Sequence, residues 1–345
     1  MSGPEVTEPE GAALWRAVAS GGAAPGTVSE GALARFAELA SPVLADHLLG
    51  GGLLPAADVE QSRLNNRFRL AAQRNCLTEI GNAGIEVVAI KGFALAHTLY
   101  PAPDIRAVGD LDILVQPRDR DTLLHHLTGL GYTFEPLPRP PWGFISEASY
   151  APFVSADSAC NLDVHIHPDC YPAYRSLTTD LLFERSVTVD ADGYTFRAAS
   201  ADHAFLLCAT NAAKDKFGPF AARKIADAMR LVAAGDLDWD MLDGLAEAGG
   251  FRMPFRVFVR LLAALGVAPG HLPAYAHAPL PARTREEYRR MLAETLRLYP
   301  TEPGLGATLR RELLLSTEPA VGLRNAVSRL RGLVRRGSGV PAPPA

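Results

Sequence analysis

Short apolar runs separated by turn residues mark the middle of the chain. The runs at 85–90 and 110–115 are rich in Val, Ile and Leu, and a stretch with helical spacing follows each, so they predict two buried strands. Paired extended stretches at 149–167 and 186–196 predict two hairpins. This order of elements predicts an α/β core over residues 85–198.

Helical spacing of apolar residues dominates on both sides of this core. Helices are predicted before it over 29–49 and 56–83, and after it over 201–216, 219–234, 238–248, 251–265, 284–298 and 304–316. We therefore expect four regions. They are an N-terminal helical region with a disordered start (1–84), the α/β core (85–198), a helical domain (199–319), and a basic amphipathic segment with a disordered tail (320–345).

Composition and charge narrow the function classes. The 345 residues include 34 basic and 38 acidic side chains, and the net charge of −4 gives no global electrostatic case for binding long nucleic acids. The four cysteines show no C-x-x-C spacing, the N-terminus lacks a signal-peptide pattern, and no apolar run reaches about 18 residues. We therefore expect a cytoplasmic protein with reduced thiols and no transmembrane segment.

The clearest chemical signal is a D-x-D motif, Asp110-Leu111-Asp112, at the second predicted strand. Side chains alternate along a strand, so Asp110 and Asp112 share the face opposite the buried one. Two adjacent carboxylates repel each other unless a cation lies between them, and Mg²⁺ prefers such hard oxygen ligands. The pair predicts a magnesium site; the alternative is an exposed strand end whose two aspartates bind nothing.

The strand predicted at 161–167 carries further candidate ligands. Alternation places Asp163, His165 and His167 on one face. If this strand lies beside the D-x-D strand, three carboxylates come together, a set that can hold two metal ions for an in-line phosphoryl displacement. The alternatives are a polar strand face without a metal and a zinc site. The zinc candidates are Cys160, His165, His167, Asp169 and Cys170.

Basic residues near these strands predict phosphate contacts. Lys91-Gly92 lies where a buried strand meets a helix; the glycine lets backbone N–H groups approach a phosphate, and Lys91 adds a point charge. The alternative is an ordinary strand-to-helix turn. Lys214, at a later helix end, could contact a triphosphate or an anionic acceptor, or could simply be solvated. The proline-rich segment 136–142 predicts a loop that could cover the site.

Together these segments resemble the DNA polymerase β-like nucleotidyltransferase superfamily, and more narrowly a bacterial group described as nucleotidyltransferase family proteins. The resemblance covers residues 64–270 and departs from the group at Asn211, where a histidine is expected. It rests on Lys91-Gly92, Tyr100-Pro101, Arg106, Gly109–Val115, Gly131-Tyr132 and Asp163-Val164-His165. It implies a nucleotidyltransferase-like mixed β-sheet core flanked by helices and followed by an all-helical domain.

The resemblance also implies a reaction, the Mg²⁺-dependent transfer of an NMP group from an NTP to a hydroxyl, with release of pyrophosphate. Asp110 and Asp112 would bind metal, and Asp163 would bind a second metal ion and orient or deprotonate the acceptor. The acceptor would be a small molecule, a natural product or a peptide. The nucleotide-binding candidates are then Lys91, Gly92, Arg106, His165 and Lys214.

Two other function classes remain open from the sequence. The chain could be a non-catalytic nucleotide- or peptide-binding protein with the same fold. It could also be a zinc-dependent hydrolase built on His165 and His167. The presence of all three aspartates favours catalysis over the first alternative, and the metal content of the purified protein would distinguish the second.

Overall fold

The computed structural model describes residues 6–22, 26, 28–134, 149–191, 193–235, 237–301 and 303–327. The proline-rich loop predicted at 136–142 lies outside these residues. Of the predicted basic segment, residues 320–327 are described and are helical, while 328–345 lie outside.

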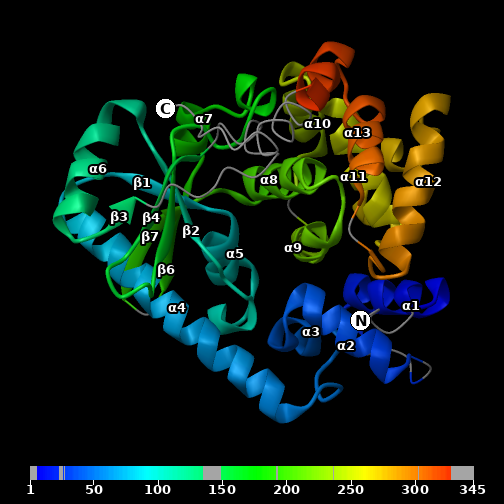
Figure 1. Ribbon diagram of the computed structural model, residues 1–345, viewed down its shortest axis with the longest axis horizontal. Coiled ribbons are helices and arrows are strands. Elements are labelled where there is room, and N and C mark those ends of the chain that lie inside the picture. The colour runs from blue at the N-terminus through cyan, green and yellow to red at the C-terminus, as the bar shows by residue number, and fades with distance from the viewer. Residues whose placement is uncertain are drawn as a thin grey trace, which may run out of the picture.

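A mixed sheet of seven strands forms the α/β part of the described chain, in the order β3-β4-β5-β2-β1-β7-β6 (Figure 1). The strands are β1 (Val87–Ile90), β2 (Leu111–Val115), β3 (Thr133–Phe134), β4 (Ser149–Val154), β5 (Asn161–His165), β6 (Val187–Ala191) and β7 (Tyr194–Ala198). In the centre, β2 is antiparallel to β1 and parallel to β5. Both predicted hairpins, β4–β5 and β6–β7, are present, and the mixed α/β class is confirmed.

The two faces of the sheet differ in chemistry. Leu111 and Ile113 of β2 and Leu162 of β5 point to one face, where they pack with helices α4 (Ala56–Asn82) and α6 (Arg120–Gly129). Strand alternation places Asp112 and Leu114 on the opposite face. Leu114 belongs to the apolar core that the sheet shares with the later helices. The second face of the sheet therefore packs against the helical half that contains α8 (Ala201–Lys214), α9 (Ala222–Ala234) and α11 (Arg252–Ala264).

Helices make up most of the remaining described chain. The other helices are α1 (Glu8–Ser20), α2 (Glu30–Ala40), α3 (Pro42–Leu48), α5 (Lys91–Leu99), α7 (Thr179–Glu184), α8 (Ala201–Lys214), α9 (Ala222–Ala234), α10 (Trp239–Ala248), α11 (Arg252–Ala264), α12 (Ala282–Leu296) and α13 (Leu305–Leu314). The six helices predicted after the core are present with small shifts at their ends. Helix α7 escaped prediction because six residues are too few to show an apolar period.

The single helix predicted over 29–49 is wrong, because the chain forms two helices there. Ser41 takes a positive φ of 97°, and Pro42, which has no N–H to continue the ladder, begins α3. Nearer the start, Thr7 and Glu10 form a capping box at the beginning of α1, which buries Trp15 fully.

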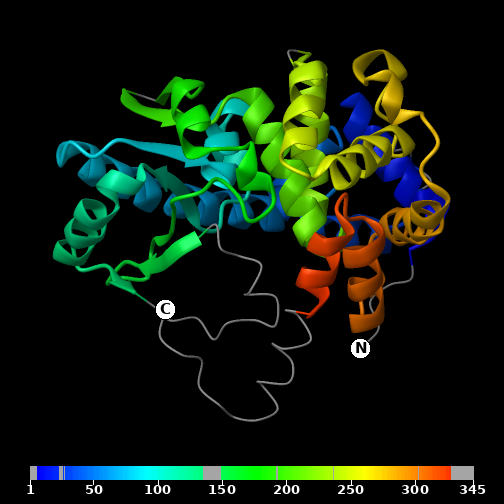
Figure 2. The same ribbon diagram turned by 90° about the horizontal axis from the view of Figure 1, so that it is seen from above.

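The sheet and the later helices lie side by side as two halves of an elongated molecule (Figures 1 and 2). Helix α4 runs along the sheet, whereas α1 packs against α9 and α12 and therefore joins the helical half. Within the described ranges, no helix combines the length and the apolar character needed to cross a bilayer. The four predicted region boundaries stay predictions.

Candidate active site

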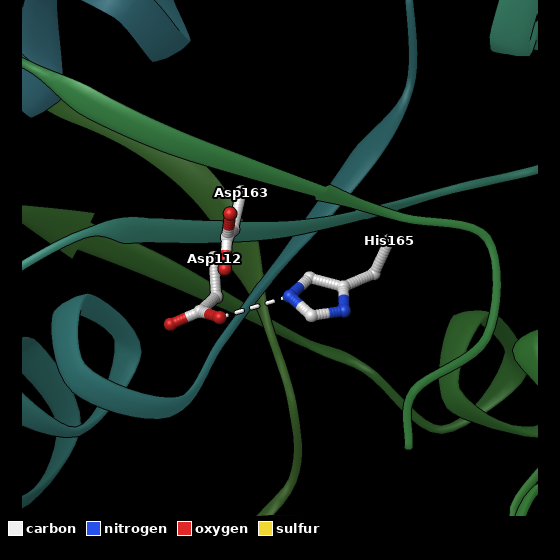
Figure 3. A group of neighbouring side chains, drawn as sticks. All are labelled: Asp112, Asp163 and His165. Carbon is white, nitrogen blue, oxygen red and sulfur yellow. Dashed lines mark hydrogen bonds and ion pairs between the residues drawn. The ribbon is translucent and has the colours of Figure 1, made fainter. Parts of the chain in front are cut away.

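Three candidate ligands from two neighbouring strands meet on the polar face of the sheet. Asp112 of β2 lies opposite Asp163 of β5 in the parallel register, and His165 follows two residues later on the same face. One ligand atom from each of these residues lies within 4.8 Å of the others. Figure 3 shows the two carboxylates side by side and the imidazole turned toward Asp112. The sequence analysis made the meeting of these carboxylates conditional on the two strands being neighbours, and the structure shows that they are.

Lys91 joins this cluster from the end of β1. It is the first residue of α5 and has a positive φ of 58°, so the chain turns sharply there. Its Nζ lies 2.5 Å from Asp112 Oδ1 and 3.3 Å from His165 Nε2. The same Asp112 oxygen is 2.9 Å from His165 Nε2. We refer below to Lys91, Asp112, Asp163 and His165 as the strand-face cluster.

The charges in the strand-face cluster are unevenly compensated. Burial opposes the ionisation of Asp112, but the Lys91 ammonium and the hydrogen bond from His165 outweigh it and hold the pKa of Asp112 well below its usual range. Burial raises the pKa of Asp163, and the nearby charge of Asp112 raises it further. One ammonium, that of Lys91, therefore lies beside two carboxylates. It pairs with Asp112, so the negative charge of Asp163 has no close ion-pair partner among the described residues.

His165 is a neutral group in this cluster. Its side chain is 2% exposed. Burial lowers its pKa, and the Lys91 charge lowers it further. A carboxylate only accepts hydrogen bonds, so the 2.9 Å contact with ionised Asp112 favours the imidazole proton on Nε2, and the 3.3 Å approach of Lys91 Nζ to that nitrogen is then a contact between two donors. The other ring nitrogen, Nδ1, is buried and has no hydrogen-bond partner among the described residues.

The donor set fits a divalent cation. Two carboxylates from adjacent strands supply the hard oxygen atoms that Mg²⁺ and Mn²⁺ prefer, and His165 lies where it can orient Asp112 or supply a nitrogen ligand. A cation would also compensate the charge of Asp163, whose pKa is raised in its absence. Asp112, Asp163 and His165 are therefore the residues that could hold a metal.

Asp110 occupies a different position from the one its motif predicts. It precedes β2 and is exposed, and its carboxylate is not among the three ligand groups that meet. Its charge still contributes to the raised pKa of Asp163, so it lies near the cluster on the solvent side. Its role as a metal ligand stays a prediction.

Arg106 and Gly92 lie against each other, and Gly92 directly follows Lys91 of the strand-face cluster. The Arg106 guanidinium is buried and pairs with Asp227 of α9, with Nη2 2.7 Å from Oδ2 and Nε 3.1 Å from Oδ1. The Tyr100 hydroxyl donates to the same carboxylate at 2.7 Å. A Cβ on Gly92 would lie 2.9 Å from Arg106 Nη1, so the glycine makes room for the guanidinium. Phosphate binding by either residue stays a prediction.

Lys214 reaches toward the cluster from the end of α8. Its Nζ lies 3.7 Å from Oδ1 of Asp169, which follows β5. Burial opposes the charge of Lys214, but several acidic neighbours, Asp169 foremost and Asp112 least, together outweigh it and raise the pKa of the ammonium. The described contacts therefore give Lys214 an acidic partner, and nucleotide binding by it stays a prediction.

The zinc alternative finds no ligand set of its own in the described part of the chain. The one group of close candidate ligands there contains neither His167 nor a cysteine. The His167 ring instead stacks on Tyr174, with 4.6 Å between ring centroids. All four cysteines are free and buried.

Two acidic residues were missed as structural partners by the sequence analysis. Asp227 is fully buried, and a lone acid inside the apolar run Ile225–Met229 was the available signal for it. Asp169 is 1% exposed, and its place two residues beyond His167, in the alternation that includes Asp163, was the signal there. Neither signal identifies the basic partner, because each partner comes from a distant helix or loop.

Comparison with known proteins gives one family. Residues 46–266 match a family model described as uncharacterised nucleotidyltransferase. The match includes β1, β2, β5 and helices α4 to α11, and hence every residue of the strand-face cluster. A search of curated proteins gave no match.

Proposed function

The chain belongs to this family of uncharacterised nucleotidyltransferases, and from that premise we propose that it transfers an NMP group from a Mg²⁺-bound NTP to a hydroxyl of a small molecule, natural product or peptide. The observation that carries the proposal is the strand-face cluster. Two carboxylates from adjacent parallel strands lie together with one lysine, and this arrangement suits binding of a cation and a polyphosphate.

Each residue of the cluster has a part in this proposal. Asp112 and Asp163 hold the metal, and His165 orients Asp112 through its Nε2 hydrogen bond. Lys91 supplies a point charge beside the phosphates. A bound divalent cation would supply neutralisation of the charge that develops on the phosphate oxygens. Two such ions are proposed, with Asp110 as the further ligand at the solvent side.

The bond changes follow from this placement. The acceptor oxygen forms a bond to the α-phosphorus while the bond from that phosphorus to the bridging oxygen breaks, and pyrophosphate leaves with the electron pair. The acceptor hydroxyl loses its proton, and Asp163 is the proposed recipient because its carboxylate oxygens can accept a proton at the site that it forms with Asp112. Positioning and charge compensation then account for most of the catalysis.

The test begins with nucleotide binding. Calorimetric titration with each of the four NTPs should show Mg²⁺-dependent binding to the native chain, abolished by EDTA and strongly weakened in Asp112→Asn. Asp121→Asn is a matched control, because Asp121 is exposed on α6 and its ion-pair partner among the described residues is its neighbour Arg120. Equal binding by both variants would contradict the proposed site.

A second measurement distinguishes catalysis from binding alone. Pyrophosphate release is followed with an NTP and a panel of hydroxyl-bearing acceptors, for the native chain and for the double variant Asp110→Asn/Asp112→Asn. The proposal expects release only from the native chain. Release that survives in the double variant would show that the carboxylates are not the catalytic centre.

A further inference from the structure

A second feature of the molecule is a cavity of about 90 Å³ beside the strand-face cluster. It lies where the segment after β5 meets the end of α8, the start of α11 and the region from α13 onward. Its walls include Asp169, Lys214, Phe217, Phe255, Arg311 and Asn325. No residue of the strand-face cluster lines it, so it is distinct from the proposed metal site.

The cavity contains a buried acceptor atom that lacks a donor. Asp169 is 1% exposed, and its Oδ1 accepts the backbone N–H of Cys170 at 2.7 Å. Its Oδ2 is buried and makes no hydrogen bond of good geometry among the described residues, although the Thr210 hydroxyl lies near the same carboxylate. A buried polar atom without a partner is unfavourable, so a donor group of a ligand would satisfy it.

The charged groups in the walls are otherwise paired. Lys216 Nζ lies 2.7 Å from Glu312 Oε1, and Arg311 is fully buried between Glu287 at 3.1 Å and Glu294 at 2.7 Å. Lys214 faces Asp169. Because each of these cations has an acidic partner, the described walls of the cavity carry no excess of positive charge and do not suit a triphosphate.

The wall nearest to Lys214 is held in an unusual backbone conformation. Lys216 and Phe217 are consecutive non-glycine residues with positive φ angles of 56° and 51°. Arg311 Nη1 donates to the Lys216 carbonyl at 2.7 Å, and the Phe217 N–H donates to the Ala212 carbonyl at 2.8 Å. Strained backbone of this kind persists only where the surroundings fix it, and it places the buried Phe217 ring against the cavity.

Charged groups of the cavity and of the strand-face cluster lie close enough to shift each other's pKa. Asp169 lies four residues beyond His165, which is the last residue of β5. The charge of Lys91 acts on Asp169, and the charge of Asp112 acts on Lys214. A molecule seated in the cavity would therefore lie beside the place where the proposed transfer occurs.

We propose that this cavity binds the body of the acceptor, and that the acceptor is an uncharged small molecule with an apolar body and a neutral hydrogen-bond donor facing Asp169 Oδ2. This assignment rests on the proposed nucleotidyl transfer. A neutral donor suits the site because the Asp169–Lys214 pair is already balanced, and an apolar body suits the Phe217 and Phe255 walls.

Phenol and toluene are matched probes for this assignment, because they have the same shape and differ by a hydroxyl against a methyl group. Ligand-observed NMR titration of the native chain should show phenol binding at least tenfold more tightly than toluene. Inorganic pyrophosphate should not displace phenol. Equal affinities for the two probes, or displacement by pyrophosphate, would overturn the assignment.

Ala213→Phe fills the cavity, since Ala213 lines it, and Ala233→Phe on the exposed side of α9 is the control. With folding checked by circular dichroism, Ala213→Phe should lose phenol binding but keep Mg²⁺–NTP binding within threefold of native. Loss of NTP binding in this variant alone would assign the cavity to the nucleotide instead. If the native chain binds phenol but no Mg²⁺–NTP, the proposed function fails and the acceptor assignment fails with it.

Discussion

Two buried groups of charged side chains lie near the sheet, and they differ in whether their charges balance. In the strand-face cluster, one lysine serves two carboxylates, and the pKa of Asp163 is raised as a result. In the second group, Arg106, Asp227 and Tyr100, one guanidinium meets one carboxylate, and a hydroxyl donates to it as well. A cation bound at the strand-face cluster would compensate its excess negative charge. The Arg106–Asp227 pair already has equal opposite charges, and it links the sheet to α9 of the helical half.

The largest effect that would test this difference is on stability. Asp227→Ala should lower the free energy of unfolding by about 3–5 kcal/mol, because it leaves the buried Arg106 guanidinium without a counter-ion. Urea unfolding followed by circular dichroism measures this. Asp121→Ala, at an exposed site, should change the unfolding free energy little.

A double variant sharpens the same prediction. Arg106→Met/Asp227→Leu removes both charges and should recover much of the stability lost in Asp227→Ala, since no unpaired charge stays buried. If Asp227→Ala were as mild as Asp121→Ala, the second group would not be the balanced structural pair that the distances indicate.

The next effect concerns metal affinity at the unbalanced cluster. His165→Ala should weaken Mn²⁺ binding by about 10–100-fold, because Asp112 loses the group that orients it. Electron paramagnetic resonance of free Mn²⁺ during titration gives the affinity directly. His167→Ala is the matched control, since His167 stacks on Tyr174 outside the cluster, and similar losses in both variants would count against the site.

The shared face of Asp112, Asp163 and His165 could be predicted from the sequence, because it depends on the position of each residue within its own strand. Period-two alternation gives the face of Asp112 and of Asp163, and only the pairing of β2 with β5 had to be assumed. The same reasoning placed Asp110 with Asp112, but β2 begins only at Leu111, so Asp110 lies outside the ladder and faces solvent. A strand boundary of one residue decides which aspartate meets the others.

The second group was not predictable in the same way. Arg106 and Asp227 are 121 residues apart in the sequence. They meet because α9 packs against α5, the helix that follows β1. The break between α2 and α3 was also missed, although Ser41-Pro42 was visible, because the apolar spacing continues across it. Local periodicity gives elements and faces, whereas partners across the two halves depend on the whole packing.

The pH dependence of stability offers a smaller and more specific test of the imbalance. Burial and Asp112 raise the pKa of Asp163 in the folded chain, so the folded state holds this proton more tightly than the unfolded one. The native chain should therefore lose stability relative to Asp163→Asn as pH rises from about 4, the ordinary aspartate pKa, through the raised value. Urea midpoints across this range measure it.

The direction of this pH dependence can be compared with that of Asp121, an aspartate whose pKa is lowered instead of raised. Arg120 lowers the pKa of Asp121, so the native chain should gain stability relative to Asp121→Asn as pH rises out of the acid range, although exposure keeps the gain small. Saturating Mg²⁺ should remove the Asp163 trend, because a cation favours the carboxylate. The same slope for both aspartates would contradict the charge imbalance.

The smallest expected effect concerns the contact between Gly92 and Arg106. Gly92→Ala places a Cβ 2.9 Å from Arg106 Nη1, which the buried Asp227 pair prevents from moving freely, so the unfolding free energy should fall by about 1 kcal/mol. Gly81→Ala, in a helix and with open space around its Cβ, should raise it by about 0.5–1 kcal/mol. Opposite signs from two glycine-to-alanine changes, read from urea unfolding, would show that the balanced group extends to the start of α5. A gain in Gly92→Ala would instead mean that the guanidinium can move away from the added Cβ, and that the Arg106–Asp227 pair does not restrain the start of α5.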